Sequence, residues 1–300
     1  MKQPIIPDAG KRAAEKMFWP GSLGDRDFTV LVETAASGGF NTMAISPLAI
    51  HRLLQSGRCV DDILAEAQEK NIKIMQMDGV SSWAPIHCPA SAPPGIQARF
   101  AFSARQCLDM AKSLGLQSML IAGAFEQGAL PLDVLVKAFA DFCDAAAERH
   151  IDVDLEFVSF WGIPDLPSAW EIIRQAERPN GRILIDTWHL QKGSNDFERD
   201  MRLLASIPAE YIRYLQIADA PAASAGVSLY AEGRFRCFPG GGVLDIGRMV
   251  QTVATGGVRF VGMEIFGKAI DELSPSDAGQ RCADAVQPYI QMLRSTYEEI

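Results

Sequence analysis

Short, nearly continuous apolar runs recur along the chain, and each is followed by a stretch of helical length with apolar residues on one side. Such runs are typical of strands buried on both faces, as in a parallel sheet covered by helices. An eighth strand is needed near Met17–Trp19, ahead of the first predicted helix. The seven clearer runs predict strands at 40–46, 72–78, 118–123, 152–158, 182–188, 214–220 and 259–266.

The intervening stretches predict the helices. The segment 61–70 begins with carboxylates and ends with Lys, which suits both ends of a helix dipole. Eight strand–helix units without a linker predict one α/β domain, a (β/α)8 TIM barrel over residues 1–300 with its active site at the C-terminal strand ends. An open doubly wound sheet is the alternative, but no G-x-G-x-x-G follows a strand. The predicted helices are 26–37, 61–70, 102–114, 132–149, 168–177, 197–206, 245–255 and 277–297.

Composition narrows the function classes. The 300 residues are 48% hydrophobic and 22% charged, which is ordinary for a globular protein with a sizeable core. A net charge of -9 repels phosphate backbones, so no nucleic-acid partner is expected. The six scattered cysteines form no C-x-x-C pair and predict reduced thiols. No secretory signal and no apolar run of roughly 20 residues are present, so we expect a cytoplasmic protein without membrane contact.

Four predicted strands each carry one polar side chain near the C-terminal end of an apolar run: Glu156, Asp186, Gln216 and Glu264. The C-terminal ends of barrel strands meet at one mouth. A carboxylate in an apolar strand is costly unless it is paired, hydrogen-bonded or metal-bound, and three converging carboxylates repel one another. One divalent metal ion removes that repulsion, although a salt bridge or a strand cap explains each residue taken singly.

The oxygen-rich ligand set favours Mn²⁺ or Mg²⁺, and Zn²⁺ and Co²⁺ are compatible with it. Because the chain has no dinucleotide fingerprint, no nucleotide cofactor is predicted.

Five short motifs follow one another in the second half of the chain: L-E-F with Glu156, D-T-W-H with Asp186 and His189, Q-I-A-D with Gln216, R-C-F-P-G-G-G with Arg236, and M-E-I-F with Glu264. Their order and placement resemble the xylose isomerase-like barrel superfamily, specifically its sugar phosphate isomerase/epimerase group, over nearly the whole chain. The resemblance implies that the four strand-end residues hold the metal, with Gln216 where many members have His. The three-metal apurinic endonucleases of that superfamily use many His ligands. This chain has four His, so a DNA-repair role is not expected.

Further residues are candidates for substrate binding. The resemblance implies that His189, in the loop after its strand, contacts a substrate hydroxyl or carbonyl. Arg236 precedes a glycine-rich turn and suits a phosphate, a carboxylate or an enediolate oxygen; Arg234 suits the same role. A surface histidine and solvated loop arginines are the structural alternatives.

Loop residues after the third and fifth strands complete the candidates. Trp83 and His87 follow the third strand and Trp161 follows the fifth, where aromatic faces commonly pack on a sugar or ring substrate. Ordinary loop packing explains each of them as well. Asp219 is a candidate for orienting Gln216 or Arg236.

Three functions fit these residues. The leading hypothesis is isomerisation or epimerisation of a sugar, keto-sugar or polyol-derived substrate through an enediolate, with Glu156 and Glu264 as base and acid. The second is a lyase that dehydrates a keto-inositol or dehydroshikimate-like substrate, with His189 or His87 as the acid for the leaving group. The third is carbohydrate binding or bond cleavage within a larger complex. A homo-oligomer through the helical exterior, with the C-terminal helix as a candidate surface, fits barrels of this kind.

Overall fold

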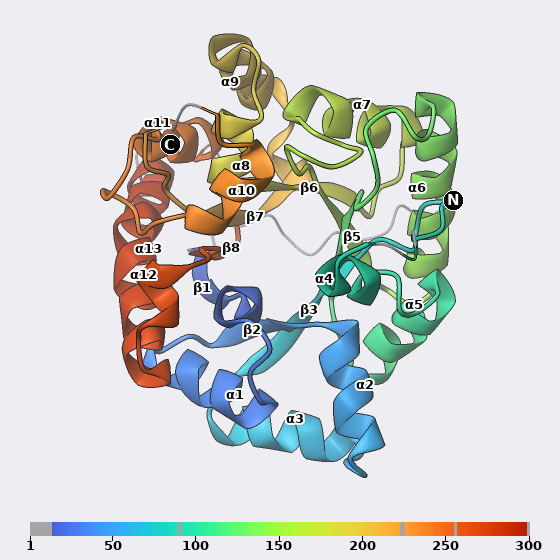
Figure 1. Cartoon of the computed structure of the whole chain (residues 1–300), viewed down its shortest axis with the longest axis vertical. Helices are drawn as coiled ribbons and strands as arrows, with labels where there is room; N and C mark the ends of the chain where they lie inside the picture. The colour runs from blue at the N-terminus through green and yellow to red at the C-terminus, as the bar shows by residue number, and fades with distance from the viewer. Residues whose placement is uncertain (1–13, 89, 91, 223–225, 255–256, 299–300) are drawn as a thin grey trace.

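The protein is described by a computed structural model that covers residues 14–88, 90, 92–222, 226–254 and 257–298. Eight parallel strands close into a barrel in chain order, as predicted, and helices surround it (Figure 1). The first predicted strand is also found. The strands are β1 (Glu15–Phe18), β2 (Thr42–Ile45), β3 (Lys73–Val80), β4 (Ser118–Ala122), β5 (Asp152–Glu156), β6 (Gly181–Asp186), β7 (Ile212–Ile217) and β8 (Phe260–Met263).

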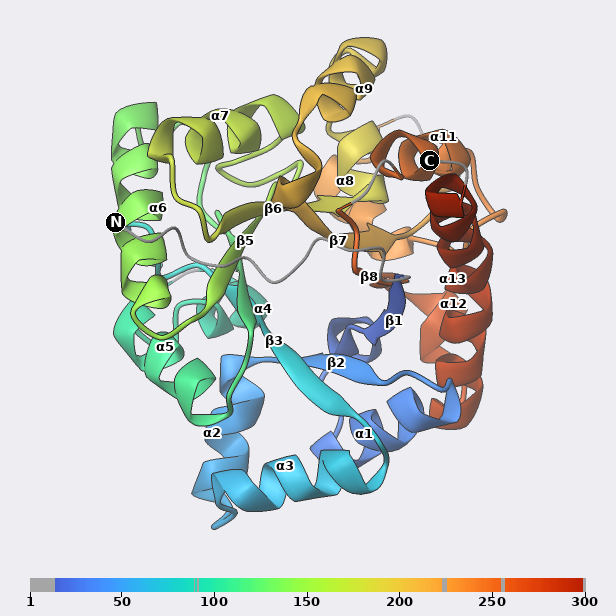
Figure 2. The ribbon, with the colours of Figure 1, turned by 180° about the vertical axis from the view of Figure 1, so that it is seen from behind.

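The predicted helices form an outer ring that is also seen from the opposite end of the barrel (Figure 2). The last of them, α13 (Pro275–Glu298), packs along α1 (Phe28–Ser37) and joins the end of the chain to its beginning. The other predicted helices are α3 (Val60–Glu69), α5 (Ala104–Ser113), α6 (Leu132–Ala147), α7 (Leu166–Ala176), α9 (Phe197–Ser206) and α11 (Ile246–Val253). Additional helices are α2 (Pro47–Gln55), α4 (Pro94–Ala98), α8 (Thr187–Lys192), α10 (Leu229–Glu232) and α12 (Lys268–Asp271).

A buried layer closes the interior of the barrel. Its apolar members are Met17, Trp19, Ala44, Met75, Leu120, Leu184, Tyr214 and Phe260. Polar side chains complete the layer: Gln76 accepts a hydrogen bond from Nε1 of Trp19 at 3.0 Å and donates one to Asp154 at 3.2 Å. Side chains two residues apart on a strand share a face. The residues two positions beyond this layer therefore face the barrel mouth, including Glu156, Asp186 and Gln216.

The segment after β6 differs from the prediction. The strand expected at 182–188 ends at Asp186, whose Oδ1 accepts the backbone N–H of His189 at 2.8 Å and caps α8. Asp is a preferred N-cap because its carboxylate satisfies a free N–H of the first turn. His189 therefore lies on a helix and not in a loop, and its side chain is fixed beside the strand end.

Among the described residues, no helix combines the length and the apolar character that crossing a membrane requires.

Candidate active site

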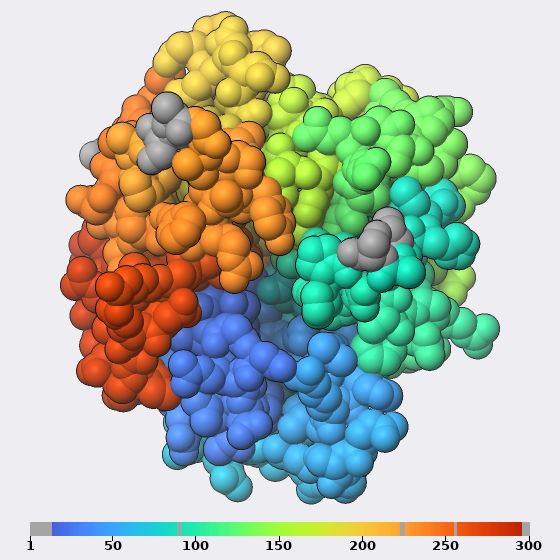
Figure 3. Space-filling view, viewed as in Figure 1, coloured from blue at the N-terminus to red at the C-terminus, as the bar shows by residue number. Residues whose placement is uncertain are grey.

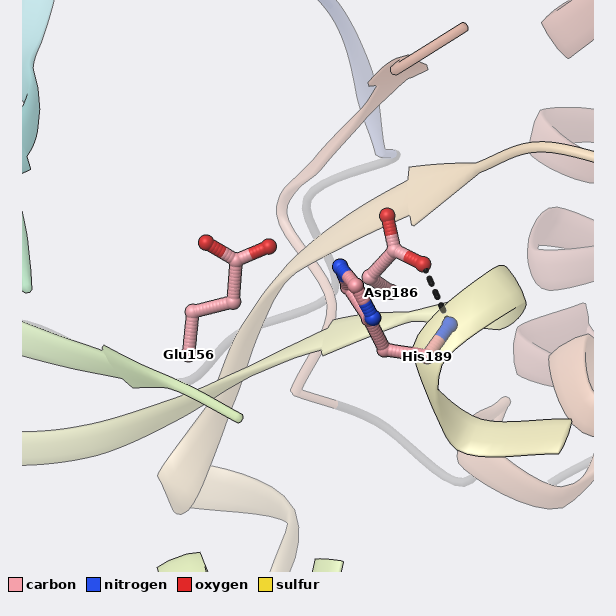
Figure 4. A group of neighbouring side chains, drawn as sticks. All are labelled: Glu156, Asp186 and His189. Carbon is pink, nitrogen blue, oxygen red and sulfur yellow. Dashed lines mark hydrogen bonds between the residues drawn. The ribbon is translucent and has the colours of Figure 1, made fainter. Parts of the chain in front are cut away.

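The four strand-end residues meet at the barrel mouth. Glu156 ends β5, Asp186 ends β6, Gln216 lies near the end of β7 and Glu264 directly follows β8. All four are buried, with exposed fractions of 7% or less. Figure 4 shows the Glu156 carboxyl facing Asp186 and His189 from the neighbouring strand end. One ligand atom from each of these three residues lies within 4.8 Å of the others, so they form a group that can hold a metal ion.

Arg236 reaches into the same site and is 3% exposed. Its Nη1 donates to Oδ2 of Asp186 at 2.8 Å, to Oε2 of Glu264 at 2.9 Å and to the backbone oxygen of Glu264 at 3.0 Å. The guanidinium lies between the rings of Trp188 and Phe266, about 5 Å from each. Arg234, the alternative from the sequence, is exposed at the rim. The carboxylates at the mouth thus carry a cationic partner from the chain itself.

His189 is held by contacts at both ring nitrogens. Its Nε2 lies 2.8 Å from Nη2 of Arg236, and its Nδ1 lies 2.9 Å from Oγ of Ser159. Because a guanidinium only donates hydrogen bonds, Nε2 accepts this one. Nδ1 in turn accepts the backbone N–H of Ser159 at 3.2 Å. The Nε2 lone pair therefore points into the site.

Among the described residues, the side chain of Gln216 has no hydrogen-bond partner. It is fully buried on β7 beside Asp186, and neither its amide nitrogen nor its amide oxygen has a hydrogen-bond partner. A buried amide without a hydrogen bond costs about 1–3 kcal/mol, so such groups usually have a function. A cation next to Asp186 would satisfy the amide oxygen, so the donor set at this mouth fits a divalent metal ion.

Burial dominates the electrostatics of the site. Burial, together with the charges of Glu264 and Asp186, raises the pKa of Glu156 well above its usual value. Burial raises the pKa of Glu264 to about 8, although Arg236 opposes the shift. Burial acts in the same direction on Asp186, but Arg236 and His189 outweigh it and the pKa of Asp186 is lowered. Burial lowers the pKa of His189 to about 3, so the imidazole is neutral near pH 7.

A cavity of about 480 Å³ opens above these residues and reaches the surface. Figure 3 shows the hollow at the centre of this face of the barrel. Trp161 and Phe160 form part of its wall, and the substrate contact expected of Trp161 stays a prediction. A second cavity of about 220 Å³ lies towards β2 and β3, and Arg99 borders both cavities. The remaining residues that line the larger cavity, of about 480 Å³, are Pro93, Pro94, Gly95, Ile96, Val158, Tyr230, Gly233, Arg234 and Phe266.

Three predicted residues lie elsewhere. The Trp83 indole is buried, donates to the backbone oxygen of Ala122 at 3.0 Å and packs edge-on against Phe139, so it fills space outside the mouth. His87 is exposed and borders neither cavity. The carboxylate of Asp219 accepts backbone N–H groups and does not orient Gln216 or Arg236. Its donors are Ala220, Gly240, Gly242 and Leu244, at 2.8–3.0 Å.

Two charged residues that border the cavities, Asp78 and Arg99, were not predicted. Asp78, near the C-terminal end of β3, borders the smaller cavity, and its charge raises the pKa values of Glu156 and Glu264. Its position in the run 72–78 carries the same signal as the other strand-end carboxylates. Arg99 caps the C-terminal end of α4 and has no sequence signal of its own.

Comparisons with known proteins agree with the fold. Two curated relatives, from Pseudomonas aeruginosa and Pseudomonas putida, are both named 3-dehydroshikimate dehydratase. They are 28% identical over 54% of this chain and 26% identical over 64% of it. The chain spans only 25% and 30% of their lengths. The crystal structure of the IolI protein with a bound zinc atom superposes with a TM-score of 0.77 at 16% identity, covering 92% of this chain and 98% of that one.

The family described as xylose isomerase-like TIM barrel matches residues 32–286, which include every strand end of the mouth from β2 to β8. This chain belongs to the xylose isomerase-like TIM barrel family.

Proposed function

We propose that this protein is a metal-dependent lyase that removes water from a small hydroxylated ketone of the 3-dehydroshikimate type. The observation that carries the proposal is the meeting of two carboxyls of raised pKa, Glu156 and Glu264, with the unpartnered amide of Gln216 in one buried mouth. The names of the two curated relatives favour dehydration as the outcome.

The metal would be held by Glu156, Asp186, Gln216 and Glu264, with the Nε2 lone pair of His189 directed at the same place. Mn²⁺ and Mg²⁺ suit the oxygen donors, and the imidazole admits Zn²⁺ or Co²⁺. When bound, the ion stabilises the negative charge that develops on a carbonyl oxygen. Arg236 already pairs with Asp186 and Glu264, so it must give up these contacts when the ion binds.

The carboxyl groups of the chain move the protons. The Glu156 carboxylate takes the proton from the carbon next to the carbonyl, and burial makes this carboxylate a stronger base than one in water. The electron pair of that C–H bond forms the double bond as the neighbouring hydroxyl leaves. Glu264, on the opposite side of the mouth, gives its proton to the departing hydroxyl, which leaves as water. Proton exchange with solvent then deprotonates Glu156 and reprotonates Glu264 for the next turnover.

His189 is less suited than Glu264 to protonate the leaving group. Its Nε2 accepts the hydrogen bond from Arg236, and its Nδ1 faces the backbone N–H and the hydroxyl of Ser159, so neither ring nitrogen presents a proton to the cavity. We assign to His189 a hydrogen bond from a substrate hydroxyl. His87, the other acid considered from the sequence, lies outside both cavities.

Product analysis tests the proposal. Mn²⁺-loaded protein incubated with 3-dehydroshikimate should form a product lighter by one water that absorbs in the ultraviolet, because loss of water leads to an aromatic dihydroxybenzoate. Glu156→Gln and Glu264→Gln should each lower turnover at least about 100-fold, the usual range for a proton-transfer group. Glu171→Gln, on the exposed side of α7, is the matched control and should be unaffected. Turnover of both site variants within about tenfold of wild type, roughly 1.4 kcal/mol, would contradict the assigned roles.

Isomerisation or epimerisation is the second candidate. Glu156 ends β5 and Glu264 follows β8, so the two carboxyls can remove a proton and return one at different faces of the same carbon. This reaction leaves the substrate mass unchanged and incorporates deuterium from D2O at that carbon. Such a product, without loss of water, would favour isomerisation over the lyase.

A further inference from the structure

Arg99 presents a guanidinium without an anionic partner to the barrel mouth. Its Nη1 is buried and has no hydrogen-bond partner, and no ion pair involves Arg99 in the part of the chain that the structure describes. Arg99 borders both the main cavity and the smaller one beside Asp78. A buried donor on a charged group costs free energy unless something binds to it, so this position requires an explanation.

The guanidinium is held in place from two sides. It stacks on Trp161, with 4.9 Å between Cζ and the ring centroid. On the β3 side it lies against Gly79, where a Cβ atom would come within 2.4 Å of Nη1. The backbone oxygen of Arg99 also accepts the N–H of Ser81 at 3.0 Å, which ties this segment to the end of β3. Arg99 is therefore a fixed part of the cavity wall.

The same cavity wall contains the proton-transfer residues. Arg99 and Glu156 both line the main cavity. Burial raises the pKa of Glu156, and the Arg99 charge opposes that rise. Burial raises the pKa of Asp78, and the charge of Arg99 opposes this rise, although Asp78 and Arg99 form no ion pair. Arg236 is neutralised by Asp186 and Glu264. Among the described residues of the mouth, the Arg99 guanidinium thus remains without an ion-pair partner, and its Nη1 is free to bind an anion.

The glycine-rich turn after Arg236 is not available as an anion site. The N–H groups of Gly240 and Gly242 both donate to Asp219 at 3.0 Å, so the glycine-rich turn offers these donors to its own chain. A phosphate usually takes several backbone N–H groups, as at a nest or a helix N-terminus. A carboxylate needs fewer donors and suits a single guanidinium.

We propose that Arg99 binds a carboxylate of the substrate and so makes this enzyme specific for an acid over a neutral sugar. The inference deepens the proposed function and rests on it only in placing the reacting carbon near Glu156. With the carboxylate at Arg99 and the ketone near Asp186, the two polar ends of the substrate would define its orientation in the cavity.

Binding measurements on the Mn²⁺-loaded protein test this. The probes are 3-dehydroshikimate and 3,4-dihydroxybenzoate as acids, D-fructose as the neutral sugar and D-fructose 6-phosphate as the phosphate, each measured by titration calorimetry. Wild type should bind at least one of the two acids more tightly than it binds D-fructose or D-fructose 6-phosphate. Arg99→Gln should weaken that binding by about 10- to 100-fold, as expected for loss of a charged hydrogen bond. It should leave the Kd for Mn²⁺ and any binding of D-fructose unchanged.

Two further variants separate a specific contact from a general effect. Arg105→Gln removes the same charge from an exposed site outside the mouth and should change acid binding by less than about twofold. Trp161→Leu removes the stacking partner and should weaken acid binding less than Arg99→Gln does; it also serves if Arg99→Gln does not fold. Lower salt should strengthen acid binding to wild type more than to Arg99→Gln, which lacks the charge.

Unchanged acid binding in Arg99→Gln would overturn the proposal, as would wild type that binds neither acid or prefers the sugar phosphate. Its failure can be told from that of the proposed function. Arg99-dependent acid binding without any loss of water contradicts the lyase alone, whereas loss of water with an unchanged KM in Arg99→Gln contradicts the role of Arg99 alone.

Discussion

Arg236 is the cation that compensates the buried carboxylates, so its removal should destabilise the metal-free protein. The guanidinium side chain is 2% exposed and pairs with Asp186 at 2.8 Å and Glu264 at 2.9 Å, which are themselves 0% and 10% exposed. Removing one partner of a buried ion pair typically costs about 3–5 kcal/mol because it leaves an unpaired charge. Glu264 can take up a proton, which limits the loss. We therefore expect Arg236→Gln to cost about 3 kcal/mol, the lower end of this range.

The assay is urea unfolding of Arg236→Gln and wild type, in EDTA and in Mn²⁺. In EDTA the free energy of unfolding of the variant should be lower than that of wild type by the full amount, about 3 kcal/mol. In Mn²⁺ the difference should shrink, because an ion at 100 times its Kd adds about 2.7 kcal/mol and no guanidinium competes with it in the variant. The Kd for Mn²⁺ should accordingly be lower in the variant.

Arg234→Gln is the matched control, two residues away, exposed and without an ion pair in the described part of the chain. It should stay within about 0.5 kcal/mol of wild type in both conditions. The reasoning is refuted if Arg236→Gln in EDTA lies within about 1 kcal/mol of wild type. It is also refuted if Mn²⁺ stabilises both proteins equally, because Arg236 and the ion would then not share the carboxylates.

Other parts of the fold give further predictions. Gly262→Ala should lower the free energy of unfolding by about 3 kcal/mol, because its Cβ would lie 1.9 Å from a backbone oxygen of β1. Gly247→Ala, in α11 with open space around it, should instead raise that free energy by about 0.5–1 kcal/mol, and thermal unfolding measures both. Asp219→Ala removes the charged acceptor of three N–H groups in the glycine-rich turn and should cost about 2 kcal/mol or more, seen as faster proteolysis of that turn. At pH 8, iodoacetamide should label exposed Cys59 and spare Cys107, since burial raises the pKa of Cys107 to about 11; equal labelling in mass spectrometry would contradict this burial.

The barrel could be predicted because its strands leave a strong signal. Each strand is buried on both faces, so it appears as an apolar run that a single sequence displays. The residues at which the strands end are harder to predict from the sequence. Trp188 continues the apolar run after Asp186, although it already belongs to α8, where it packs as a fully buried side chain. The N-cap role of Asp186 was the signal that would have placed this boundary.

The short helix α2 was missed for a related reason. Ser46 and Pro47 mark its start, with Oγ of Ser46 accepting the N–H of Ala49 at 3.1 Å. These are ordinary N-cap and first-turn residues. The helix follows β2 directly, so its apolar residues merge with those of the strand in the sequence.

The strand-end residues of the site could be predicted because charged groups in apolar strands are costly and need a reason. Their partners could not. The insertion of Arg236 between Asp186 and Glu264 depends on the path of the segment after β7, and the position of Arg99 depends on the segment after β3. The aromatic residues were ambiguous for the same reason. Trp83 and Trp161 both follow strands, yet one packs outside the mouth and the other lines the cavity.

The most direct test of the central claim is anomalous diffraction from crystals of this protein grown in saturating Mn²⁺. We predict one manganese peak at the barrel mouth, in contact with oxygens of Glu156, Asp186, Gln216 and Glu264, and the guanidinium of Arg236 withdrawn from Asp186. A mouth without a manganese peak, in which Arg236 still pairs with Asp186 and Glu264, would contradict the account.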